Sequence, residues 1–187
     1  MNRLILFILL FCIALSCTQR KSVNEKIWES LGDLPQLTGK PNYLKSPYTS
    51  AGDRVYLIGN QDGTFPDMGW HVEGEMGGIW MHPIKLMDGF TSSLTYDGET
   101  ICLDNAISFT NYPIGNLIDF GKTSTGIHVK RLQFVPDGKE GLVIFFHFQN
   151  VTPEDISFDF LHMFYIGLFK QTRSIISQHP YFYTRRI

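Results

Sequence analysis

The stretch that decides the fold is Ile127–Phe160, with the sequence IHVKRLQFVPDGKEGLVIFFHFQNVTPEDISFDF. Two clusters of turn-forming residues, Pro136–Glu140 and Val151–Asp155, separate three runs rich in β-branched and aromatic side chains. The middle run, Leu142–Phe148, is apolar at nearly every position, which is typical of a strand buried on both faces. In the last run, Ile156–Phe160, apolar and polar residues alternate, which indicates a strand with one face in solvent. The stretch therefore predicts three consecutive antiparallel strands.

The residues before this stretch also read as short strands. Asp97-Gly98 separates two of them and is a strong signal for a two-residue hairpin turn. The length of 187 residues suits one domain. Many short strands at close spacing predict an all-β, antiparallel β-sandwich at residues 49–160. We expect Leu132, Phe134, Phe146 and Phe148 in its interior. The other predicted strands are Arg54–Ile58, Gly78–His82, Ile84–Met87, Phe90–Tyr96, Glu99–Leu103 and Ala106–Tyr112.

Residues 1–17 have the features of a bacterial export signal. Arg3 supplies a positive charge, and Leu4–Leu15 is an unbroken apolar run. This run is shorter than the roughly 20 residues that a membrane-spanning helix needs. It ends in Ala-Leu-Ser-Cys, which resembles the lipobox of bacterial lipoproteins. We therefore expect a lipoprotein signal peptide, with Cys17 as the lipidated residue after cleavage. An ordinary signal peptide with an incidental cysteine is the alternative.

The two ends of the mature chain differ from its centre. Residues 18–48 are predicted to form a tether and lead-in, with a short helix at Lys26–Leu31 followed by prolines that keep the chain extended. Residues 161–187 contain no acidic residue and follow neither a strand nor a helix period. They predict an aberrant or poorly packed tail, caused by a frame change or truncation near residue 161, with Tyr165, Phe169, Tyr181 and Phe182 partly exposed. A native basic tail or a last pair of strands is the alternative.

The stretch Gly52–Phe90 is rich in glycine and holds two of the three tryptophans. Glycine allows a positive φ and the close approach of a ligand. Aromatic rings beside carboxylates on such loops suit a surface that contacts a polar ligand with flat apolar faces, such as a sugar. Tight turns whose tryptophans fill the core are the alternative. The candidate substrate-binding residues are Trp70, His71, Glu73, Glu75, Trp80 and His82.

Residues 51–90, AGDRVYLIGNQDGTFPDMGWHVEGEMGGIWMHPIKLMDGF, resemble the start of large exported glycosidases of Bacteroidetes, often labelled glycogen-debranching proteins. These enzymes are akin to glycoside hydrolase family 63 and related (α/α)6-barrel enzymes. The run LVIFFHFQNVTPEDISFDF also resembles their N-terminal β-sandwich. The resemblance covers about residues 46–160. It implies that this chain is a truncated piece whose natural partner is the missing C-terminal (α/α)6 barrel, where the family carries its catalytic carboxylates.

The sequence predicts no catalytic residue, metal or cofactor in this chain. Glycoside hydrolysis uses two carboxyl groups about 5 to 9.5 Å apart, and in a strand Glu73 and Glu75 would lie on one face about 6.5 to 7 Å apart. The resemblance nevertheless places the catalytic acids in the barrel. His71, Glu73 and His82 lack the tight spacing of a metal motif such as His-Glu-x-x-His, and no phosphate loop or dinucleotide fingerprint is present.

The predicted function is that of a non-catalytic sandwich domain of a lipid-anchored carbohydrate-active enzyme. Its expected partners are a glycan or oligosaccharide and, through the lipid, a bacterial membrane facing the periplasm or the cell surface. The formal net charge of −2 argues against nucleic acid as a partner. Two alternatives stay open. One is a free-standing carbohydrate-binding module, and the other is a structural interaction domain whose Gly- and Trp-rich stretch packs against another protein.

Overall fold

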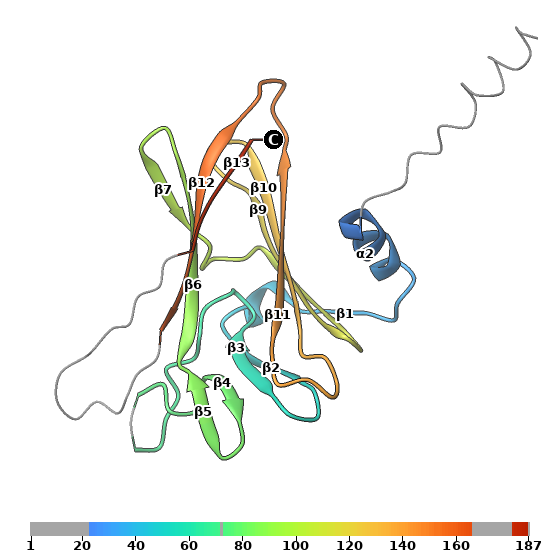
Figure 1. Cartoon of the computed structure of the whole chain (residues 1–187), viewed down its shortest axis with the longest axis vertical. Coiled ribbons are helices and arrows are strands. Elements are labelled where there is room, and N and C mark those ends of the chain that lie inside the picture. The colour runs from blue at the N-terminus through green and yellow to red at the C-terminus, as the bar shows by residue number, and fades with distance from the viewer. Residues whose placement is uncertain (1–22, 72, 166–180, 187) are drawn as a thin grey trace, which may run out of the picture. The chain divides into compact units, whose positions relative to one another are not determined.

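The computed structural model describes residues 23–71, 73–165 and 181–186. The described strands form three antiparallel sheets that pack together, so the predicted all-β, sandwich-like fold is confirmed (Figure 1). A helix, α2 (Val23–Leu31), precedes the strands and begins earlier than the predicted Lys26. The described chain divides between Leu34 and Pro35, and α2 belongs to the first of the two units. All sheets belong to the second unit.

The first sheet has five strands. Its order is β1 (Leu37–Thr38), β8 (Ser108–Tyr112), β9 (Gly115–Lys122), β10 (Ile127–Phe134) and β11 (Val143–Asn150). The strand β9 was not predicted, because its sequence GNLIDFGK carries glycines and polar residues that read as a turn. It pairs with both β8 and β10, and its Ile118 is fully buried. Pairing with β8 and β10 therefore outweighs the weak preference of this sequence for strand structure.

The second sheet contains the confirmed hairpin. Its order is β13 (Tyr181–Arg186), β12 (Ser157–Tyr165), β6 (Gly89–Tyr96) and β7 (Glu99–Cys102). Asp97 and Gly98 connect β6 to β7 with φ angles of 48° and 78°. Positive φ at both central residues is the requirement of a type I′ turn, whose twist matches the flanking strands. The dipeptide therefore sets the register of this hairpin.

The predicted end of the sandwich at residue 160 is corrected by β12. This strand continues to Tyr165 and pairs with β6 over its whole second half, from Leu161 opposite Ser93 to Tyr165 opposite Gly89. The backbone of β13 pairs with the first half of β12. Pairing with β6, and with β13 as far as His162, holds residues 161–165 in the sheet although their sequence lacks a clear period. Tyr165 is 37% exposed, in line with the prediction. Phe169 and the side chains of Tyr181 and Phe182 lie outside the described part of the chain.

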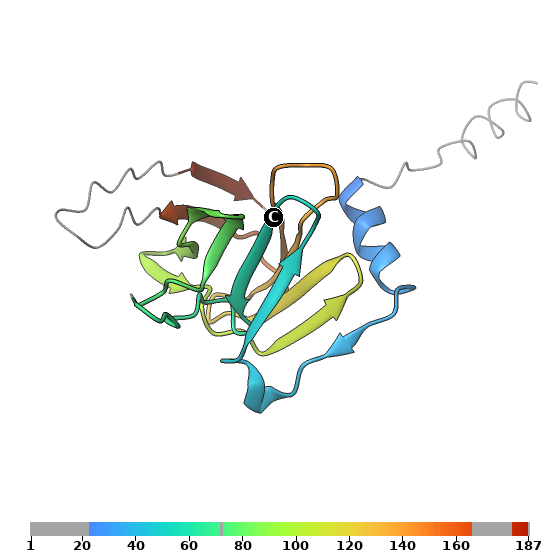
Figure 2. The ribbon, with the colours of Figure 1, turned by 90° about the horizontal axis from the view of Figure 1, so that it is seen from below.

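The third sheet contributes to one of the two apolar clusters in the interior. Its order is β2 (Pro47–Ala51), β3 (Tyr56–Asn60), β4 (Gly78–Met81) and β5 (Ile84–Met87), and it faces the viewer in Figure 2. Leu57 and Ile79 from this sheet pack with Phe90 and Val135 in one cluster. The other cluster lies between the first two sheets and includes Ile118, Val129 and Phe158. Strand β1 begins at Leu37 and β2 at Pro47, so the sheets start before the predicted boundary at residue 49 and include part of the predicted tether.

Of the four predicted interior residues, Leu132 is fully buried and the three phenylalanines are partly buried. Phe146 and Phe148 pack against the cluster between the first two sheets. Phe134 is likewise half-buried, and it stacks on Phe145 of β11 at a centroid distance of 6.3 Å.

Candidate functional site

The loop between β3 and β4 carries four of the six candidate residues. It folds back on itself, since the Gly74 amide donates to the Asp67 carbonyl at 3.0 Å and the Met76 amide donates to the Met68 carbonyl at 2.9 Å. Gly74 has a φ of +77°, which a residue with a side chain adopts only with strain. We refer to residues 67–76 as the Trp70 loop.

Glu75 fixes the tip of the Trp70 loop. Its Oε2 accepts hydrogen bonds from the backbone amides of Trp70 at 3.0 Å and His71 at 2.9 Å. The His71 Nδ1 lies 3.5 Å from the other carboxylate oxygen. The amide of His71 and then that of Trp70 lower the pKa of Glu75, because they donate to its charged form. Glu75 is therefore an ionised turn-stabilising group and is unsuited to donate a proton as a general acid.

Lys85 of β5 holds the other side of the Trp70 loop. Its Nζ donates to the Gly74 carbonyl at 2.7 Å and forms an ion pair with Asp88 at 2.6 Å. The same ammonium group lies 5.5 Å from the centre of the Trp80 ring. A cation over a tryptophan face is attracted by the negative face of the ring. Lys85 thus links the loop, the β4–β5 hairpin and Trp80 into one surface.

The candidate residues separate into an exposed tip and a supporting base. Trp70 is 88% exposed, and His71, Glu73 and His82 are also exposed. Trp80 is half-buried, lies parallel to Tyr56 at 6.3 Å, and donates its indole N–H to the Gly77 carbonyl. Glu73 and Glu75 lie in a turn, so the strand spacing considered for a catalytic pair does not exist. Among the described residues, no three His, Cys, Asp or Glu side chains converge as in a metal site.

Replacing Glu75 by glutamine is expected to loosen the tip of the Trp70 loop. The neutral amide accepts more weakly than the carboxylate from the two backbone N–H groups. We expect faster hydrogen exchange at the Trp70 and His71 amides, measured by NMR, with unchanged exchange in β10. Glu73→Gln is the matched control, because it leaves both bonds in place. The same loosening should occur in the wild type as the pH falls through the lowered pKa of Glu75. Equal exchange in both variants at neutral pH would contradict this role.

Sequence reasoning missed a polar cluster inside the sandwich, centred on Arg131 of β10. Arg131 is 2% exposed, donates to the Gly63 carbonyl at 3.1 Å, and lies over the Phe90 and Phe120 rings at 4.9 and 5.5 Å. Gln133, also buried, donates to the Tyr48 hydroxyl. Burial raises the pKa of Tyr48 to about 12, so its hydroxyl stays protonated. Arg131 and Gln133 of β10 are thus interior residues, although the sequence pattern predicted that the interior side chains of this strand would be apolar.

His162 of β12 borders this cluster. Its Nδ1 lies 2.8 Å from the Ser92 hydroxyl, and its ring packs edge-on against Phe164 at 4.6 Å. Burial, and secondly the charge of Arg131, lowers the pKa of His162 to about 4. An apolar groove of about 300 Å³ lies beside it, lined by Leu142, Ile144, Phe146, Phe160, His162 and Phe164.

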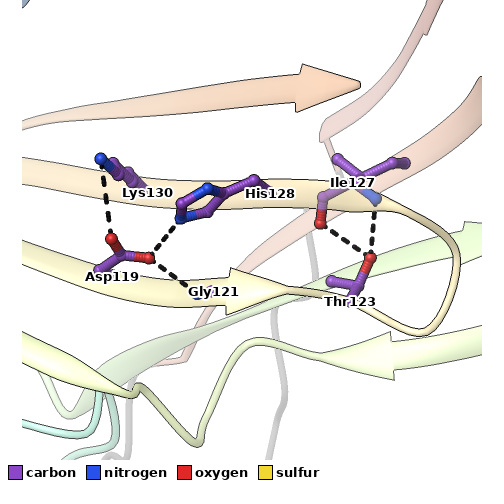
Figure 3. Close-up of polar contacts among 6 residues, drawn as sticks. All are labelled: Asp119, Gly121, Thr123, Ile127, His128 and Lys130. Carbon is purple, nitrogen blue, oxygen red and sulfur yellow. Dashed lines mark hydrogen bonds and ion pairs between the residues drawn. The ribbon is translucent and has the colours of Figure 1, made fainter. Parts of the chain in front are cut away.

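A second polar group lies on β9 and β10 (Figure 3). Asp119 accepts from His128 Nε2 at 2.7 Å and from the Gly121 amide at 2.8 Å, and its other oxygen is 3.7 Å from Lys130 Nζ. The register between β9 and β10 shifts at this point, and Gly121 has a φ of +71°. These contacts stabilise a β-bulge, so we assign the group a structural role.

Comparisons with protein-family models, curated proteins and solved structures gave no match to this chain. No helix among the described residues is long and apolar enough to span a membrane. The functional argument therefore rests on the geometry of the candidate residues, above all those of the Trp70 loop.

Proposed function

We propose that this chain is the non-catalytic N-terminal β-sandwich of an exported, lipid-anchored glycoside hydrolase of the glycogen-debranching type, and that the Trp70 loop contacts the glycan. The observation that carries the proposal is the 88% exposure of Trp70 on a loop held by Glu75 and Lys85. A large aromatic side chain is costly to expose. A flat, exposed indole matches the apolar face of a sugar ring, while neighbouring His71 and Glu73 offer hydrogen-bonding groups.

The proposal assigns catalysis to the barrel domain of the family that the chain resembles. Glu75 is bound to two backbone amides, and Glu73 lies beside it in the same turn. A catalytic pair needs one carboxyl group kept protonated near neutral pH, and the lowered pKa of Glu75 is the opposite of that requirement. The sandwich is expected to position substrate next to the barrel, and Cys17 is expected to carry the lipid.

The test of this assignment is a sugar-release assay on the purified chain with glycogen and maltoheptaose. We expect no release above the rate without protein. Glu73→Gln and Glu75→Gln are included to identify contaminating activity, which these variants would leave unchanged. Release that disappears in either variant would show that the chain is itself catalytic and would overturn the proposal.

The second candidate function is a protein-interaction domain. Met68 and Met76 lie next to each other on the Trp70 loop and are 44% and 53% exposed. Methionine adapts to irregular apolar surfaces and is frequent at adaptable binding sites. Together with Trp70, the two methionines form an apolar surface that also suits contact with another protein. Replacing both methionines by serine distinguishes the candidates, because a glycan contact depends on Trp70 whereas protein docking depends on all three side chains.

A further inference from the structure

The ammonium group of Lys85 is partly buried and is already engaged by the protein. The Lys85 side chain is 20% exposed, and its Nζ lies 2.6 Å from the Asp88 carboxylate and 2.7 Å from the Gly74 carbonyl. The centre of the Trp80 ring is 5.5 Å from the same Nζ. An ammonium group has only three N–H donors. Lys85 is therefore better suited to hold a neighbouring segment than to bind a ligand directly.

The backbone of Asp88 belongs to the sheets. Its amide donates to the carbonyl of Tyr165 in β12 at 3.0 Å, and the next residue, Gly89, begins β6 and pairs with Tyr165. Strand β4 also lies close to it, since a Cβ added to Gly78 would be 2.9 Å from the Asp88 carbonyl oxygen. Lys85 thus connects a carboxylate on the sheets to Gly74, which belongs to the Trp70 loop.

The bond from Lys85 to Gly74 acts on the part of the loop that leads to Trp70. Gly74 has a φ of +77°, and no other described atom lies within 4 Å of the Cβ that a side chain would add there. Side-chain packing therefore does not hold Gly74 in place. Its neighbour Glu75 accepts a hydrogen bond from the Trp70 amide at 3.0 Å. A shift of the Gly74 backbone would move Glu75 and, through it, the backbone of Trp70.

We propose that Lys85 is a positioning residue for the glycan contact, and that its ammonium group, placed by Asp88, holds the Trp70 loop in the conformation that binds the glycan. This inference rests on the proposed glycan contact of Trp70 and names what sets its affinity. A loop that is ordered before the ligand arrives loses less conformational freedom on binding. The ion pair joins side chains that are 20% and 33% exposed, so its own contribution to stability is small. The effect of Lys85 is therefore expected in ligand binding.

Calorimetric titration of maltoheptaose into the unaltered chain and three lysine variants tests the proposal. We expect Lys85→Met to weaken binding about tenfold, because it keeps the aliphatic part of the side chain but loses the bond to Gly74. Lys85→Arg keeps the charge and the donors, and it should restore most of the affinity. Lys130→Met is the matched control, because it removes a lysine paired with Asp119 on another sheet, and it should bind as the unaltered chain does.

Two results of this titration would contradict the proposal in different ways. Equal binding by Lys85→Met and the unaltered chain would overturn the positioning role of Lys85 and leave the glycan contact standing. Absence of binding to the unaltered chain would overturn the glycan contact and the positioning role together.

Hydrogen exchange at the Gly74 and Met76 amides distinguishes positioning from a purely structural role. These amides close the loop by donating to the carbonyls of Asp67 and Met68. In Lys85→Met we expect faster exchange than in the unaltered chain without ligand, and equal exchange at saturating maltoheptaose, because the ligand selects the held conformation. Exchange that stays fast in the saturated variant would overturn the proposal. If circular dichroism shows that Lys85→Met does not fold, Lys85→Gln replaces it in both measurements.

Discussion

Replacing Arg131 by alanine is expected to lower the free energy of unfolding by about 3–5 kcal/mol. The truncation leaves a cavity among Phe90, Phe120 and Tyr48, and it removes the donor to the buried Gly63 carbonyl. Urea unfolding followed by tryptophan fluorescence measures the loss. Arg131→Met keeps most of the volume without the charge and is expected to cost clearly less, because a buried charge itself carries a desolvation cost.

Lys130→Ala is the control for this prediction. Lys130 is the neighbouring residue on the opposite face of β10, and its side chain is 35% exposed with a partner, Asp119, at 3.7 Å. Partly exposed ion pairs contribute little, so the variant should lie within about 1 kcal/mol of the wild type. A loss for Arg131→Ala as small as that for Lys130→Ala would contradict the buried position of the guanidinium.

Lowering the pH from 6.5 to 4 is expected to destabilise the fold through His162 by up to about 3 kcal/mol. The pKa of His162 is lowered from 6.5 to about 4 by burial and by the charge of Arg131. Between these values the unfolded chain binds a proton that the folded chain does not. Stability from the neutral imidazole is therefore complete above pH 6.5 and is lost as the pH falls toward 4.

Urea unfolding of the wild type and His162→Asn across this pH range measures the effect. Asparagine offers a polar group to the Ser92 hydroxyl but does not titrate. Because all other groups are shared, the difference between the two stability curves reports His162 alone. His71→Asn is the control, since the His71 side chain is 75% exposed. Parallel curves for the wild type and His162→Asn would contradict the buried, neutral state of His162.

Local signals in the sequence predicted the elements that depend on local chemistry. Asp97-Gly98 predicted its hairpin because the turn itself demands a positive φ at both positions. Strand β9 escaped prediction because its glycines and polar residues read as a turn, although it pairs with its sequence neighbours β8 and β10. The second half of β12 escaped prediction because it is stabilised by pairing with β6, which is distant in sequence. Arg131 also escaped prediction, since its burial depends on Phe90 and Gly63, which lie far from it in the chain.

The candidate site was predictable in composition but not in arrangement. The glycine-rich stretch drew attention to Trp70, yet only the fold shows that Trp70 is exposed while Trp80 is half-buried against Tyr56. Glu75 accepts a hydrogen bond from the Trp70 amide because the loop folds back between these two residues, which are five positions apart in sequence. The groove depends on two strands from different sheets, so no pattern along the chain identifies it.

Calorimetric titration of maltoheptaose into the purified chain tests the glycan contact most directly. The account predicts measurable binding that Trp70→Ala weakens at least about tenfold, while Met76→Ala, on the same loop, leaves it nearly unchanged. Absence of binding to maltoheptaose and glycogen, or binding that is equal in the wild type and Trp70→Ala, would contradict the proposal that the Trp70 loop contacts a glycan.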